Sequence, residues 1–346
     1  MEFLEGLFSA LPTALELGLF NALTVLALFL SYSMLNVCDL STDGCYTLGA
    51  AVGAMVALSG HPYLAILAAM GAGVLSGFIT AFLQTKMGVD SLLAGIIVNT
   101  GLYSINIAVM GNKSLVNLNK TRTVFTDLKP AVDQLQQKLL MLFGAPPGSP
   151  AEQTLKNILA FFSSDILIGL IAVTLVIVFL SLFLRTRLGL AIRATGNNPV
   201  MVRSSSINPV MTTIVGLCLA NAFTGLSGCL FAQSQKSMSI DVGTGMVTVA
   251  LASLLIGGAF MGRGRIPKRA VGAVLGAVIF RIVYTIALRF HMPSFMLKLV
   301  SSVIVVIAIS GPYLRSRYPM LVRRLNHRRG IGSADPETAE EDVDHA

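Results

Sequence analysis

The chain has 346 residues, of which 54% are hydrophobic and only 12% are charged. An average soluble domain carries about 25% charged residues. The mean hydropathy of +0.75 is too apolar for a surface that faces water. These values exclude an ordinary cytosolic enzyme, a nucleic-acid-binding protein and a disulfide scaffold. The net charge of +8 is more typical of the cytoplasmic loops of a membrane protein.

Apolar stretches long enough to cross a bilayer recur along the chain. A membrane-spanning helix needs about 20 predominantly apolar residues, because lipid cannot hydrogen-bond a bare backbone. A further stretch, Cys45–Ser59, is apolar but short. We therefore expect an all-α, polytopic integral membrane protein with about eight full transmembrane helices and one short or broken segment. The full spans are expected at Leu17–Leu35, Tyr63–Gln84, Leu92–Met110, Ile166–Leu184, Val210–Ala232, Val242–Met261, Ala270–Leu288 and Phe295–Tyr313.

Basic residues predict which connections face the cytoplasm, because Lys and Arg are enriched on that side. Four arginines and no acid lie between Arg185 and Arg203, and further basic groups occupy 263–269 and the chain after 313. The spans between these three regions allow all of them to face the same side. The turn at Lys86 then also faces the cytoplasm, and the long segment from Asn112 to Ser163 faces the outside.

The predicted domain organisation follows from this topology. The membrane domain covers 1–313 and includes an extracytoplasmic segment at 111–164, in which residues 149–152 are typical of a helix start. It also includes a cytoplasmic loop at 185–209. The tail 314–346 is basic and then acidic, and we expect it to be disordered. The N-terminus lies outside if the short stretch crosses the membrane, and inside if that stretch only dips in and returns.

Polar residues interrupt the chain between the first span and the short stretch, in Asn36-Val-Cys-Asp-Leu-Ser-Thr-Asp-Gly44. One interpretation is a broken helix whose unwound backbone lines a cavity, as in many transporters. The other is a cytoplasmic turn, for which Asp43-Gly44 is a typical dipeptide. Spacing alone favours the turn. In the first interpretation, Asp39, Ser41 and Asp43 are candidate residues of a translocation path.

One permanent charge lies inside a predicted span. Arg281 is slightly past the middle of Ala270–Leu288, where a charge costs at least a few kcal/mol. It either faces the protein interior or a wet cavity, or it snorkels toward the outer surface. If it faces inward, its counter-charge comes from Asp39 or Asp43, from a partner subunit or from a substrate carboxylate, which would match the guanidinium.

Uncharged polar residues and small residues within spans mostly indicate helix packing. We nevertheless include Asn99 with Arg281 among the candidates for the translocation path. The polar residues are Asn99, Asn106 and Asn221, and the small residues repeat at four-residue spacing in Gly49/Gly53, Gly73/Gly77 and Gly272/Gly276.

The chain carries none of the common catalytic motifs. No Gly-x-x-x-x-Gly-Lys-Ser/Thr phosphate loop and no His-Glu-x-x-His occur, and the four histidines are scattered. We therefore expect no enzymatic activity, no cofactor and no metal site in this chain. If transport uses ATP, another chain binds it.

The loop from Arg185 to Asn208 is too long and too patterned for a minimal turn. Leu188, Ala191 and Ile192 give a short apolar stripe between arginines, and Gly196-Asn-Asn-Pro then ends that helix. The residues after this break can form a second short helix. The loop is either a basic segment at the membrane surface or a helix presented to a cytoplasmic partner.

At these residues the chain resembles the membrane-spanning permease subunits of bacterial ATP-binding-cassette importers, in the branched-chain amino acid and simple-sugar permease group. Within the group it is most similar to a branch associated with the uptake of amino acids, especially aromatic ones. The resemblance covers about 17–313, and 204–206 depart from it, because the group has small apolar residues or glycine there. It is carried by Leu188-Gly-Leu-Ala-Ile-Arg-Ala-Thr-Gly-Asn-Asn-Pro199, Ala220–Gln233, Gly243–Gly258 and Asn36–Gly49.

The resemblance implies a permease that moves a small solute across the bacterial cytoplasmic membrane. It favours an amino acid and leaves a sugar or a nucleoside as alternatives. The implied partners are cytoplasmic ATP-binding subunits, an extracytoplasmic substrate-binding protein and a second permease subunit, like or unlike. The loop becomes the coupling helix, with glycines shaping its backbone and an arginine near the ATPase. Its candidate residues are Gly189, Arg193, Ala194, Gly196, Asn197 and Asn198. Those of the translocation path are Asp39, Ser41, Asp43, Asn99 and Arg281.

Two other functions fit a chain of this composition. A self-contained secondary transporter would show two halves of matching hydropathy and paired intramembrane acids, and neither is clear here. A membrane scaffold without transport activity would leave Arg281 and the patterned loop without a purpose.

Overall fold

The computed structural model describes residues 2–142, 163–262 and 264–289, with single positions between 299 and 310. The chain divides into two units, 1–305 and 306–346, and all the described helices belong to the first. The expected helix at 149–162 and the tail lie outside the described residues, as does most of the expected span at 295–313.

Six described helices are long and apolar enough to cross a membrane, which confirms an all-α polytopic membrane fold. They are α1 (Glu2–Leu28) with its π-helical extension η1 (Phe29–Met34), α3 (Pro62–Thr85), α4 (Ser91–Val109), α7 (Ser164–Phe183), α10 (Pro209–Gln235) and α12 (Ile266–Arg289). The other described helices are α2 (Thr42–Leu58), α5 (Val124–Leu142), α8 (Arg187–Asn197), α9 (Pro199–Ser204) and α11 (Met246–Met261).

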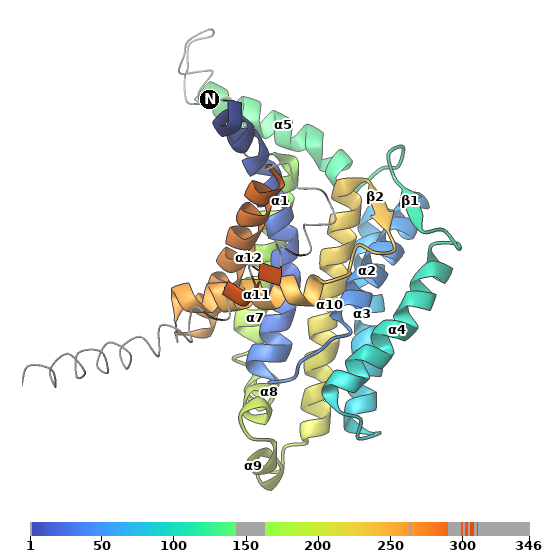
Figure 1. The fold of residues 1–346 in the computed structure, drawn as a ribbon, viewed down its shortest axis with the longest axis vertical. Coiled ribbons are helices and arrows are strands. Elements are labelled where there is room, and N and C mark those ends of the chain that lie inside the picture. Colours follow the sequence, from blue (N-terminus) through green and yellow to red (C-terminus); the bar gives the residue numbers. More distant parts are fainter. Residues whose placement is uncertain are drawn as a thin grey trace, which may run out of the picture. The chain divides into compact units, whose positions relative to one another are not determined.

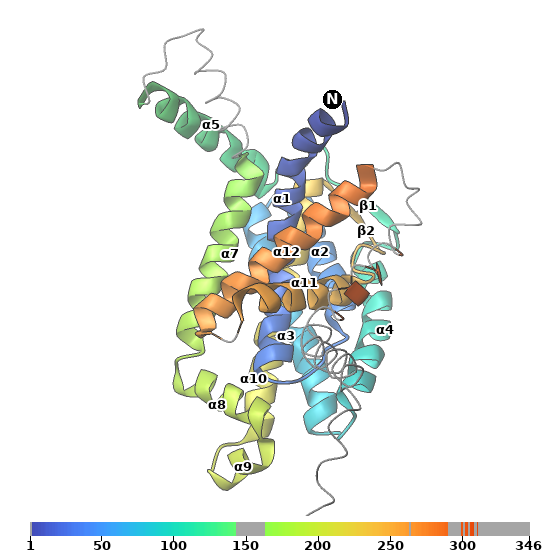
Figure 2. The same ribbon diagram turned by 60° about the vertical axis from the view of Figure 1, so that its left-hand side comes forward.

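The expected span Val242–Met261 is not among these six. Only 16 of its residues are helical, as α11, and the residue before this helix, Gly245, has a φ of 84° in the left-handed region. The chain before it turns, because a left-handed residue cannot continue a helix. In Figures 1 and 2, α11 runs crosswise to α1 and α10. The expected number of eight full spans is therefore not reached within the described residues.

Two ends of the helix bundle carry different structures (Figures 1 and 2). The start of α1, α5 and a small β-ribbon lie at one end, and α8 and α9 lie at the other. In the ribbon, β1 (Leu115–Asn117) pairs antiparallel with β2 (Ser237–Ser239), which places Val116 opposite Met238. The N-terminus thus shares an end with the segment after α4, as expected if the short stretch crosses the membrane.

The core surrounds α1, which contacts α7, α10, α11 and α12. Phe20, Leu23 and Leu26 of α1 are fully buried. The outer helices α3, α4 and α7 instead expose large apolar side chains, such as Leu67 and Leu175. In a bilayer such faces contact lipid, so the exposed apolar surface supports membrane insertion of the bundle.

Glycines let α10 approach α2 and α3 closely. A Cβ at Gly49 would lie 2.3 Å from the carbonyl oxygen of Gly225, and one at Gly73 would lie 2.2 Å from that of Asn221. At Gly276 of α12, a Cβ would lie 2.0 Å from the carbonyl oxygen of Ser253 in α11. The four-residue glycine spacing therefore does mark close helix packing, as the sequence predicted.

Candidate functional site

The first span ends in a break that leads back into the protein. Its last turn widens into the π-helix η1, where the amide of Leu35 bonds the carbonyl of Leu30 at 3.1 Å. Asn36 then takes a positive φ of 57°, which ends the helix. The chain continues without helical structure as far as Ser41 and enters α2, as Figure 1 shows between η1 and α2. π-Helical turns often occur at functional sites.

Asp39 lies in this break, and its carboxylate is buried and hydrogen-bonded on both oxygens. Oδ1 accepts from the backbone amide of Ser41 at 2.9 Å and from its hydroxyl at 2.5 Å. Oδ2 accepts from the side-chain amide of Asn221 in α10 at 2.7 Å. The hydroxyl of Thr80 in α3 reaches that of Ser41 at 3.1 Å. The carboxylate of Asp39 acts only as an acceptor in its three bonds, as an ionised carboxylate does, and the network ties the break to two helices.

The cytoplasmic-turn interpretation of residues 36–44 is therefore wrong. Asp39 is only 1% exposed and Ser41 is fully buried, whereas a surface turn would leave them in water. Asp43 and Gly44 lie in the first turn of α2 and are not a turn dipeptide. The tertiary bond to Asn221 overrides the local turn preference, which is why spacing alone misled.

Asp43 holds the start of the crosswise helix α11. Its Oδ2 accepts from the amide of Gly245 at 2.9 Å, and its Oδ1 accepts from that of Val247 at 2.8 Å. The first amides of a helix lack partners within the helix, and an acidic side chain there is favourable to the helix dipole. Asp43 thus joins α2 to α11 through a cap supplied from a distant part of the chain.

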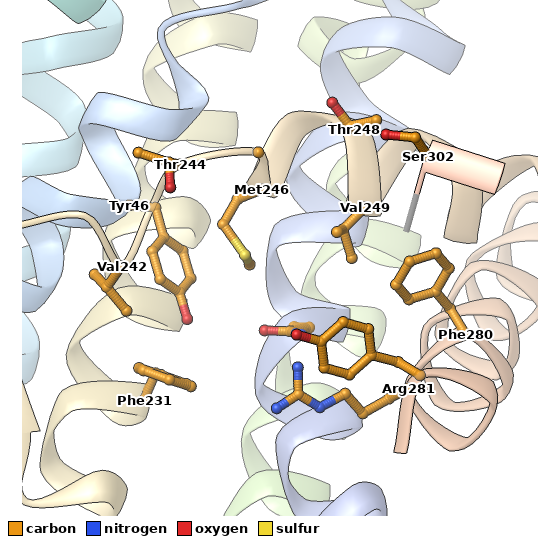
Figure 3. A pocket seen from close by; sticks show the side chains of 13 residues that line it. Tyr46, Phe231, Val242, Thr244, Met246, Thr248, Val249, Phe280, Arg281 and Ser302 are labelled. Carbon is orange, nitrogen blue, oxygen red and sulfur yellow. The ribbon is translucent and has the colours of Figure 1, made fainter. Parts of the chain in front are cut away.

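A cavity of 420 Å³ lies between α1, α2, α10, α11 and α12, and Arg281 lines it (Figure 3). Its guanidinium extends from α12 toward Tyr46 and Phe231. Arg281 therefore faces the protein interior, and the snorkelling alternative is wrong. The lining residues are Asn21, Tyr46, Phe231, Val242, Thr244, Gly245, Met246, Thr248, Val249, Phe280, Arg281, Tyr284 and Ser302.

Two buried polar atoms of this lining have no hydrogen-bond partner among the described residues. They are Nε of Arg281 and Oδ1 of Asn21. The guanidinium carbon of Arg281 lies 5.1 Å from the ring centre of Tyr284, as a cation–π contact. Buried polar groups normally have partners, so an unpaired donor and an unpaired acceptor in one cavity indicate room for a polar ligand or water.

The loop between α7 and α10 forms two short helices, as predicted. Glycines allow the first of them to pack closely against its neighbours. A Cβ at Gly189 would lie 2.2 Å from the carbonyl oxygen of Phe183, which keeps α8 tight against the end of α7. A Cβ at Gly196 would lie 2.1 Å from the carbonyl oxygen of Met34. The coupling-loop candidate Gly196 thus touches η1, at the entrance to the break that holds Asp39.

Asn198 ends α8 and starts α9. Its Oδ1 accepts from the amides of Val200 and Met201 at 3.1 and 3.0 Å, which is an N-terminal cap. Val200 is 76% exposed and Met201 is 68% exposed. On α8, Ala191 and Ile192 face the bundle as expected, but Leu188 is half-exposed. One face of this loop therefore packs on the bundle while apolar side chains stay uncovered on the other.

Comparison with known proteins decides the class of this site. Residues 13–309 match the family described as branched-chain amino acid transport system, permease component. The chain belongs to this permease family. No solved structure matches it.

Curated relatives of the permease carry names of the same kind. It is 26% identical to a tyrosine transport system permease protein of Clostridioides difficile, over 95% of this chain and all of that protein. It is 28% identical to an uncharacterised protein of Rickettsia prowazekii, over 87% and 97% of the two chains. It is 25% identical to the ribose import permease protein of Escherichia coli K12, over 78% and 75%.

The protein is thus a permease subunit of the ATP-binding-cassette importer class and a multi-pass protein of the bacterial cytoplasmic membrane. Its relatives are permease subunits and not enzymes. Membership of this family sets aside the self-contained secondary transporter and the scaffold.

The structure distributes the candidate path residues over four places. Asp39 and Ser41 share the buried network, Asp43 caps α11 beside the cavity, and Arg281 lines the cavity. Asn99 lies on α4 against Gly44, where a Cβ would meet its Oδ1 at 2.7 Å. It is not among the residues that line the cavity.

Sequence reasoning missed the partners of Arg281 in the cavity. Asn21 is a polar residue in the middle of the first span, and this was the one available signal. The aromatic residues Tyr46 and Phe231 carry no such signal, because aromatic side chains are common in apolar segments.

Proposed function

We propose that this permease imports a small solute with energy from ATP, which separate cytoplasmic subunits bind and hydrolyse. An extracytoplasmic binding protein delivers the solute, and a second permease subunit, like or unlike, completes the pathway. ATP binding shifts the complex between states that open to opposite sides, and the solute needs only a different affinity for the two states. Residues 185–209 form the cytoplasmic coupling loop in this proposal.

The observation that carries the proposal is the two-sided character of α8 and α9. The loop packs on the bundle through glycines, and on its other side leaves Val200 and Met201 uncovered. Uncovered apolar side chains next to arginines are typical of a contact surface for another protein. Gly196 contacts η1, so a displacement of α8 would also shift η1 and the break around Asp39.

An amino acid is the solute that the comparisons favour. The relative named for tyrosine transport matches nearly the whole chain, whereas the ribose import permease matches about three quarters of it. We therefore propose amino-acid uptake, with sugars and nucleosides as the alternatives.

Exposed apolar residues of α9 provide the test of ATPase docking. Val200→Asp combined with Met201→Asp should reduce copurification of the ATP-binding subunits at least about tenfold, because it places two charges in an apolar contact. Leu115→Asp is the matched control, since Leu115 is 60% exposed at the opposite end of the bundle. Copurification of the ATP-binding subunits at the wild-type level by the double variant would overturn the assignment of this surface.

Single-cysteine labelling tests which end faces the cytoplasm. With the four native cysteines replaced by alanine, Lys120→Cys should react with an impermeant maleimide in cells whose outer membrane has been removed. Ser205→Cys should react only after the cytoplasmic membrane is opened. Both positions are exposed, so access to reagent and not burial decides the result. The reverse pattern would invert the topology.

A further inference from the structure

The cavity at Arg281 contains one positive charge and no described lining residue of opposite charge. An arginine at the centre of a membrane helix is energetically costly, so it normally has a partner. The cation–π contact with Tyr284 stabilises the positive charge of the guanidinium but accepts no hydrogen bond from its edge. Nε is buried and has no hydrogen-bond partner among the described residues.

The two acids that the sequence offered as counter-charges are engaged elsewhere. Asp39 uses both oxygens for Ser41 and Asn221. Asp43 uses both oxygens for the first amides of α11. Of the sources of a counter-charge for Arg281 that the sequence suggested, a partner subunit and the substrate remain. Of these two, the substrate can enter the cavity itself.

A complementary acceptor lies on the same wall of the cavity. A Cβ at Gly18 would lie 3.5 Å from Cβ of Arg281, so α12 packs against α1 at this level. Asn21 follows three residues later on the same face of α1, and its buried Oδ1 has no partner among the described residues. A guanidinium donor and an amide acceptor that line the same cavity offer partners for the carboxylate and the ammonium group of an α-amino acid.

The opposite wall is aromatic and apolar. The rings of Tyr46 and Phe231 are 6.0 Å apart and tilted by 55°, and Phe280 and Met246 also line the cavity (Figure 3). The volume of 420 Å³ falls in the range of about 300–1,000 Å³ typical of small-molecule sites. A neutral sugar or nucleoside would leave Arg281 without a counter-charge and place hydroxyl groups against aromatic carbon.

We propose that this cavity binds the transported solute, an amino acid with an aromatic side chain. Its carboxylate is held by the guanidinium of Arg281, its ammonium by Oδ1 of Asn21, and its ring by the wall around Tyr46 and Phe231. This inference rests on the proposed import function and adds the solute-binding site to it. The charge of Arg281 is then neutralised only when the solute occupies the cavity. The affinity of the cavity for a solute therefore depends on the carboxylate of that solute.

The chain contains no tryptophan, so the indole of a ligand can be observed without background. The full permease in detergent micelles should raise the fluorescence anisotropy of L-tryptophan saturably, and unlabelled L-phenylalanine should compete. Tryptamine, which carries the same indole and ammonium but no carboxylate, should bind at least about tenfold more weakly, because it lacks the charge-assisted bidentate bond.

Variants of two arginines on one helix locate the site. Arg281→Leu should weaken L-tryptophan binding at least about tenfold and leave tryptamine binding unchanged, and Arg281→Lys should lie between, since lysine keeps the charge without the fork. Arg269→Leu is the matched control and should retain binding, because Arg269 bonds the hydroxyl of Ser33, outside the cavity.

Three results would overturn the inference: no saturable binding of L-tryptophan up to millimolar concentration, equal binding of tryptamine, or wild-type binding by Arg281→Leu. Copurification of the ATP-binding subunits with each variant is measured in parallel. Loss of ligand binding in Arg281→Leu with normal copurification supports the site. Normal ligand binding without any copurified ATP-binding subunit would instead contradict the proposed importer and leave the binding site standing.

Discussion

Replacing Gly196 with valine should abolish most of the solute-stimulated ATP hydrolysis of the assembled importer, while the permease still inserts in the membrane. A Cβ at this position would lie 2.1 Å from the carbonyl oxygen of Met34 and 2.8 Å from the carbonyl carbon of Leu35. Both are backbone atoms, so no side-chain rotation can relieve the clash. The helix α8 would have to move away from η1.

The expected loss is about tenfold or more, within the 1–3 kcal/mol that typically couples two sites in one protein. Uncoupling follows because η1 leads directly into the break that carries Asp39, and α8 is the element proposed to contact the ATPase. The measurement is ATP hydrolysis by the importer in proteoliposomes, with and without the loaded binding protein. Basal hydrolysis should change much less than the stimulated rate.

A matched control is available on α4. Gly101 is also a helical glycine, but a Cβ there meets open space, so Gly101→Val should leave stimulated hydrolysis near the wild-type rate. If Gly196→Val showed full stimulation, α8 would not transmit the signal. If both variants lost stimulation equally, the effect would come from valine in a helix and not from the contact with η1.

The parts of this structure that sequence could predict are those that depend on local pattern. Apolar length identified the helices, and the pattern Gly196-Asn-Asn-Pro identified the boundary between α8 and α9. The orientation of Arg281 was left open, because a charge within a span can point inward or snorkel with nearly the same local sequence. Only the packing of α12 on Gly18 decides between these two directions.

Long-range bonds explain the failures. The dipeptide Asp43-Gly44 has a strong turn preference, yet Asp43 caps α11, about 200 residues later in the chain. The same bond helps to place α11 crosswise, which an apolar count over Val242–Met261 cannot show. Asp39 was singled out from the sequence, but its partner Asn221 was interpreted as ordinary helix packing, since no pattern links positions so far apart.

The buried pair of Asp39 and Asn221 should have the largest effect on stability. Among the described residues, Asn221 is the only donor to Oδ2 of Asp39, at 2.7 Å, so Asn221→Leu leaves the buried carboxylate partly unpaired. Leaving a buried acceptor without its hydrogen-bond donor costs about 1–3 kcal/mol, and more when the acceptor is charged. We expect a much lower midpoint of thermal unfolding in detergent, followed by circular dichroism, and less permease in the membrane.

The double variant Asp39→Leu/Asn221→Leu separates the charge from the packing. The loss of unfolding free energy caused by Asn221→Leu should be at least about 1 kcal/mol smaller in the Asp39→Leu background than in the wild type. In that background no carboxylate is left without a partner. Asn106→Leu is the control: this amide is equally buried but donates to the neutral carbonyl of Gly44 at 3.2 Å, so its loss should cost only about 1 kcal/mol. If the effects at Asp39 and Asn221 simply added, or if Asn106→Leu were as damaging as Asn221→Leu, the buried carboxylate would not be what holds the break against α10.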